Sequence, residues 1–149
     1  MDGAALTAMQ RALKAAGAQS KIIAPRLGKL STAQGQEVTV DWSFLTAGSV
    51  LFDAVFVPGG EKSATTLAAE PRAVEFVGEA YKHCKTIGAI GDGVTLLEAA
   101  GIRAGKAQSG QKERRSGIVV GKGSDTNGVA AEFIRAVAEH RHWSRERKE

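Results

Sequence analysis

Residues 86–97 read TIGAIGDGVTLL, an apolar run that leads through Gly91-Asp92-Gly93 into a second apolar segment. A short, continuous apolar run is typical of a strand that is buried on both faces of a parallel sheet. We expect a strand at 86–90, a helix at 94–100, and Gly101 as the residue that ends this helix. The stretch therefore predicts a strand, a tight turn and a helix, which together form the repeating unit of α/β folds.

The alternation of strands and helices continues outward from this unit. Residues 51–57 form another apolar run that ends in Pro58-Gly59-Gly60, the pattern of a buried strand followed by a tight loop. A helix is expected directly after Asp2, with apolar positions at helical spacing from Leu6 to Ala16 and with Gly17 ending it. Further helices are expected at 63–69, from Pro71 to Tyr81, and at 127–140. Further strands are expected at 20–24, 37–41 and 117–121, with a turn or short hairpin at 27–35 and a polar loop at 105–116. This order predicts a flavodoxin-like, doubly wound α/β domain, a mostly parallel sheet with helices on both faces.

Length and composition limit the class of protein. A chain of 149 residues with 43% hydrophobic residues suits one core, so we expect a single domain over 1–149. Much of the net charge of +4 lies at 112–115 and 141–148, without a zinc-finger or aromatic RNA-binding pattern, so no nucleic-acid partner is expected. No apolar run approaches the roughly 18 residues that span a bilayer, and the opening residues lack a signal segment. Since Cys84 is the only cysteine, no disulfide is expected either, and a reducing cytoplasmic location fits best.

The chain opens in an unusual way for this architecture. Doubly wound domains usually begin with a strand, and in the flavodoxin-like strand order 2-1-3-4-5 that first strand lies in the interior of the sheet. Only Met1 and Asp2 precede the first expected helix, so the first strand is expected to be missing and the chain to be a truncated gene product or a fragment. The gap is then closed by strands that meet directly, by another chain, or not at all.

Two glycine-rich turns form the candidate site. Gly59 and Gly60 end a strand without Cβ atoms, which allows backbone N–H groups to point at an anion in a cleft, although a plain tight turn has the same pattern. Gly91-Asp92-Gly93 has the frame of a nucleophile elbow, but a nucleophile needs a Ser, Cys or Thr side chain and Gly91 has none. We expect Asp92 to cap the following helix. The sequence therefore predicts a candidate cleft at these five residues and no catalytic residue.

Other side chains that could react or bind a partner lie outside these turns. Cys84 stands between Lys82 and Lys85, which would favour its thiolate, so a redox or catalytic role for Cys84 is an alternative. The three histidines lack carboxylates at ligand spacing, and no metal site is expected; they are His83, His140 and His142. A tryptophan lies among cations near the end of the chain, which predicts a docking surface that uses stacking, formed by Arg141, Trp143 and Arg145.

Three stretches bring a known family into view: DAVFVPGG at 53–60, EAYKHCKTI at 79–87 and AEHRHWSR at 138–145. Together they resemble the C-terminal domain of large-subunit haem catalases. That domain is similar to the class I glutamine amidotransferase-like superfamily, whose PfpI-type proteases and glyoxalase relatives carry a cysteine at the elbow. Gly91 stands at that place here, and the acidic residue of their first strand has no counterpart. The resemblance therefore does not imply hydrolase activity.

The resemblance implies an accessory role in hydrogen peroxide detoxification. In large catalases the haem and its ligands belong to a preceding β-barrel core, and the single tyrosine here, Tyr81, has no partner motif. No cofactor is expected in this chain, and the expected partners are a catalase core domain or other subunits of a catalase tetramer. Two alternatives remain open: a holding chaperone of the PfpI-like superfamily, and a weak hydrolase or glyoxalase-type enzyme that uses Cys84 or Asp92.

Overall fold

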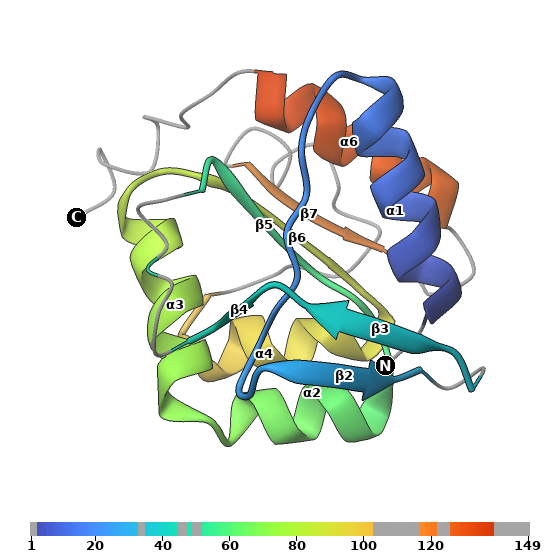
Figure 1. Ribbon diagram of the computed structural model, residues 1–149. Helices are drawn as coiled ribbons and strands as arrows, with labels where there is room; N and C mark the ends of the chain where they lie inside the picture. Colours follow the sequence, from blue (N-terminus) through green and yellow to red (C-terminus); the bar gives the residue numbers. More distant parts are fainter. Residues whose placement is uncertain are drawn as a thin grey trace.

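The protein is built around a parallel three-stranded sheet in the order β5-β6-β7 (Figure 1). The strands are β5 (Ala54–Val57), β6 (Thr86–Ile90) and β7 (Ile118–Gly121), and both pairings are parallel. Every residue of the central strand β6 is buried, as expected for a strand covered on both faces. The computed structural model describes residues 3–32, 35–44, 48, 52–102, 117–121 and 126–138.

Helices cover both faces of this sheet. Helices α1 (Gly3–Ala15) and α6 (Thr126–Ala138) pack together on one face, and α2 (Glu61–Ala68), α3 (Pro71–Lys82) and α4 (Val94–Ala99) lie on the other (Figure 1). The side chains of the strands alternate between two buried clusters. The α6-side cluster contains Ala5, Met9, Ile90, Val119, Val129, Ala130, Phe133 and Ala136. The α3-side cluster contains Val57, Ala73, Val77, Ala80, Ile87, Ala89, Leu96, Leu97, Ile102 and Ile118.

This arrangement confirms the predicted α/β class with a mostly parallel sheet and helices on both faces. The apolar runs identify β5, β6 and β7 because each of these strands contributes side chains to both clusters. Within the described residues, no helix is long and apolar enough to cross a membrane.

Four short strands lie outside the main sheet. β1 (Ile23–Ala24) pairs in parallel with β4 (Trp42–Ser43), and β2 (Gly28–Ser31) forms an antiparallel hairpin with β3 (Glu37–Val40). The expectation of a turn or short hairpin within 27–35 is met only in part, because this stretch supplies one strand of the hairpin and the strand expected at 37–41 supplies the other. Because β1 pairs with β4 rather than with β5, the two parallel units do not meet directly within the described residues.

Several boundaries differ from the expected ones. The strand expected over 20–24 shrinks to Ile23–Ala24, and β5 begins at Ala54 rather than at 51, because Asp53 is exposed and forms a bend. The first helix after β5 begins at Glu61, two residues earlier than expected, since Gly60 already accepts the N–H of Ala64. The polar loop expected at 105–116 and the last two residues of the helix expected over 127–140 lie outside the described residues.

Three helices end in the same hydrogen-bond pattern, a Schellman motif. After α1, Gly17 donates to the carbonyl of Lys14 at 3.0 Å and Ala18 donates to that of Leu13 at 2.9 Å. After α4, Gly101 donates to Glu98 at 2.9 Å. Both glycines have a positive φ, 85° and 78°, which confirms them as the predicted ends of these helices. The third instance, after α3, uses a residue with a side chain and is described with the site below.

Candidate functional site

The turn after β6 keeps the backbone shape of an elbow. Ile90 is extended, with φ −128° and ψ 137°, Gly91 turns to a φ of +56°, and Val94 is already helical. A positive φ at this position is the strained conformation that lifts a nucleophile into the cleft of an elbow. In this chain the strained position carries only a hydrogen atom, so the turn has the shape of the elbow without its reactive group.

The two candidate turns lie against each other at the carboxyl edge of the sheet. A Cβ atom built on Gly93 would lie 2.6 Å from the carbonyl oxygen of Val57 and 2.9 Å from that of Pro58. Gly93 is buried, as is Gly59 in the turn after β5, whereas Gly91 is exposed. The structure therefore brings the two predicted turns together through direct backbone packing. Whether a ligand binds beside them stays a prediction.

Asp92 does not cap the following helix, contrary to expectation. It is the middle residue of the 3₁₀ turn η2 (Gly91–Gly93), and the N-cap position of α4 is Gly93, without a side-chain hydrogen bond. The reason is geometric: an N-cap residue needs an extended backbone that precedes the first helical turn, and here the 3₁₀ turn runs directly into α4. The carboxylate of Asp92 is therefore left on the exposed surface of the turn.

Cys84 lies at the other end of β6. The whole of β6 lies between Cys84 and Gly91, and its five residues alone span about 16 Å at 3.3 Å per residue. Its side chain is 1% exposed, and its thiol donates to the carbonyl oxygen of Lys82 at a sulfur–oxygen distance of 3.9 Å. Cys84 therefore cannot supply a nucleophile to the elbow turn.

Cys84 is instead the residue that ends α3. Its N–H donates to the carbonyl of Tyr81 at 3.0 Å, and the N–H of Lys85 donates to that of Ala80 at 3.0 Å, so the Schellman motif is complete. Cys84 has a φ of +61°, which makes it the only described residue other than glycine with a positive φ. Reasoning from the sequence misses this role, because the residue type that signals such a helix end is glycine. Reasoning from the sequence also misses Lys85, whose side chain is 2% exposed.

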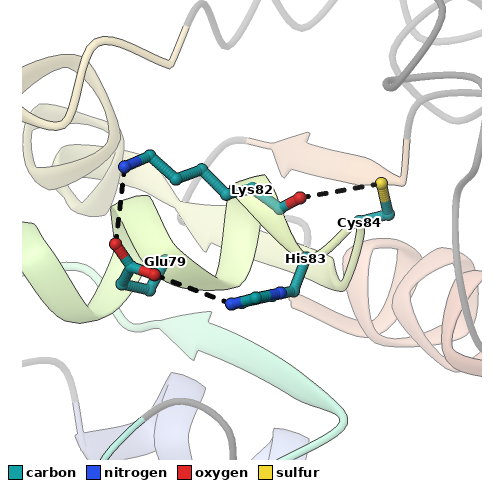
Figure 2. A network of polar contacts seen from close by, with 4 residues as sticks. All are labelled: Glu79, Lys82, His83 and Cys84. Carbon is teal, nitrogen blue, oxygen red and sulfur yellow. Dashed lines mark hydrogen bonds and ion pairs between the residues drawn. The ribbon is translucent and has the colours of Figure 1, made fainter.

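A polar network surrounds the end of α3 (Figure 2). Glu79 accepts from Lys82 at 3.5 Å and lies 3.6 Å from Nε2 of His83. These side chains are largely exposed, and ion pairs of this kind contribute at most about 1 kcal/mol. Within the described residues, no group of His, Cys, Asp and Glu side chains is arranged to hold a metal ion. The remaining predicted site residues lie outside the described residues: His140, Arg141, His142, Trp143 and Arg145.

Comparison with solved structures supports the fold. A ThiJ/PfpI domain protein from Brachyspira murdochii superposes with a TM-score of 0.75 at 19% identity, over 93% of this chain and 90% of the other. DJ-1 from Schizosaccharomyces pombe superposes with a TM-score of 0.69 at 19% identity, over 93% of this chain and 85% of the other. At this level of identity the likeness concerns the fold alone.

Comparison of sequences identifies the family. Catalase HPII of Mycobacterium avium is 40% identical over 97% of this chain, and Catalase-2 of Bacillus subtilis is 37% identical over 94% of it. The chain spans only about a fifth of the length of these relatives, 21% and 19% respectively. The family described as the C-terminal domain found in long catalases matches residues 1–147. The chain therefore belongs to the family of C-terminal domains of long catalases.

Proposed function

We propose that the chain is a non-catalytic accessory domain, which stabilises a large catalase by associating with the catalase core or with other catalase subunits. The observation that carries this proposal is Gly91, which holds the elbow conformation at φ +56° but has no reactive side chain. A glycine can keep the turn packed while supplying neither a nucleophile nor a base. The role that remains for such a turn is structural.

Tyr81, the only tyrosine of the chain, does not fit the role of a haem ligand. Tyr81 lies on α3 and packs against the α3-side cluster, so its ring belongs to the contact between the helix and the sheet. The resemblance to large catalases implies a haem in the parent enzyme. In this proposal, a part of the catalase outside this chain binds that haem. A single domain over 1–149 and a cytoplasmic location belong to the same proposal, supported by the family match over 1–147 and by the single cysteine.

The proposal is tested by combining the chain with a long catalase that lacks its own C-terminal fifth. Catalase HPII of Mycobacterium avium, truncated in this way, is co-expressed with the chain or with an empty vector. We expect the two polypeptides to co-purify and the melting temperature of the truncated catalase to rise. We expect the purified chain, mixed with haemin, to consume hydrogen peroxide no faster than haemin alone. Peroxide turnover above that of haemin alone, or no change in the truncated catalase, would contradict the proposal.

The predicted docking surface gives this experiment a matched pair of variants. Trp143→Ala should weaken co-purification, because aromatic anchors contribute most to protein interfaces. Trp42→Ala removes another tryptophan, which is 38% exposed on β4, and should leave co-purification unchanged. Equal effects of the two substitutions would contradict the assignment of the surface to Trp143.

A holding chaperone is the second candidate function, favoured by exposed apolar side chains. Leu27 is 63% exposed in the turn between β1 and β2, and Trp42 is also partly exposed. The third candidate, an enzyme that uses Cys84, is disfavoured by the burial of this thiol and its distance from the elbow turn. The aggregation of heated citrate synthase distinguishes the first two candidates. If the chain suppresses this aggregation and the Leu27→Ser variant does not, the result would support the chaperone.

A further inference from the structure

We draw no further inference here: the strongest candidate, the side-chain cluster of Glu79, Lys82 and His83 beside the buried thiol of Cys84 at the end of α3, rests on exposed ion pairs and a lone cysteine, and nothing among the described residues points to a ligand for it.

Discussion

At the scale of single residues, the packing of Gly93 holds the candidate site together. A Cβ atom on Gly93 would lie only 2.6 Å and 2.9 Å from the carbonyl oxygens of Val57 and Pro58, so no side chain fits between the two turns. Because these neighbours are backbone atoms, they cannot move aside by rotating a side chain. Gly93 therefore keeps the elbow turn in place against the turn after β5, even though the elbow has no nucleophile.

Gly93→Ala should destabilise the protein by about 1–3 kcal/mol, the usual cost of forcing extra atoms into a packed interior. Gly78→Ala is the matched control, because a Cβ atom on Gly78, in the middle of α3, would meet no atom within 4 Å. It should be neutral or stabilising by up to about 1 kcal/mol, since alanine favours the helix. Urea unfolding of both variants checks this prediction, and equal stabilities would contradict it.

Cys84 illustrates a second kind of constraint on a single residue, its backbone conformation. Cys84→Gly should change the stability little, because relief of the positive φ, about 1–2 kcal/mol, offsets the loss of a small buried side chain. Cys84→Val should be clearly destabilising, since a β-branched residue is disfavoured at positive φ. Thermal unfolding of the two variants gives the comparison. A valine variant as stable as the glycine variant would show that φ does not limit this position.

At the scale of elements, the contact between β6 and α6 depends on a missing side chain in the strand. A Cβ atom on Gly88 would lie 2.7 Å from Cδ1 of Phe133 and 3.1 Å from Cδ2 of Phe56. The two rings pack edge to face, with centroids 5.7 Å apart. Helix α6 can approach the central strand because Gly88 leaves room for the ring of Phe133.

Gly88→Ala should therefore cost about 1–3 kcal/mol, because the rings of Phe133 and Phe56 must shift. Phe133→Leu alone should also be destabilising, through lost aromatic packing. The double variant should be less destabilised than the sum of the two, because the smaller leucine leaves space for the added methyl group. Denaturant unfolding of the four proteins measures this coupling, and strict additivity would contradict the proposed contact.

The elements differ in how well the sequence predicts them. β5, β6 and β7 follow from continuous apolar runs, because burial on both faces leaves no place for polar residues. β1 and β2 are harder to predict: one is only two residues long, and the other is largely exposed, so the sequence pattern carries little information. Of the helix ends, those with glycine can be predicted, whereas the one at Cys84 cannot, because a cysteine tolerates positive φ only when tertiary contacts impose it.

The candidate site, like the elements, can be predicted from the sequence only in part. The two glycine-rich turns can be located from the sequence, and the common direction of parallel strands brings them to one edge of the sheet. The role of Asp92 could not be predicted, because a capping residue and a residue inside a 3₁₀ turn have the same local sequence. The burial of Lys85 has no signature in the sequence, since a lysine is normally exposed.

At the scale of the whole molecule, the main sheet and the β2–β3 hairpin differ in burial. β6 is buried throughout between two layers of helices, whereas most residues of the hairpin are exposed. Its strands are joined to each other but not to the main sheet within the described residues, and the ion pair between Lys29 and Glu37 lies in solvent. The stability of the molecule is therefore not expected to be uniform.

Hydrogen exchange should reflect this difference. The amides of Ile87 and Ala89 should exchange at the rate of global unfolding, whereas those of Leu30 and Val38 should exchange faster through local opening of the hairpin. Mild denaturant should accelerate exchange of the β6 amides more strongly, because global unfolding exposes more surface. Equal exchange rates and equal denaturant dependence would show that the hairpin opens only with the rest of the molecule.

The burial of the only thiol has a practical consequence for chemical labelling. A maleimide dye cannot reach Cys84 while the protein is folded, because this side chain is 1% exposed. A cysteine introduced at an open surface position, such as Leu27→Cys, would then carry the dye alone, and Cys84 need not be replaced. In unfolded molecules both thiols would react, so the number of dyes per chain, read by mass spectrometry, would count the unfolded fraction.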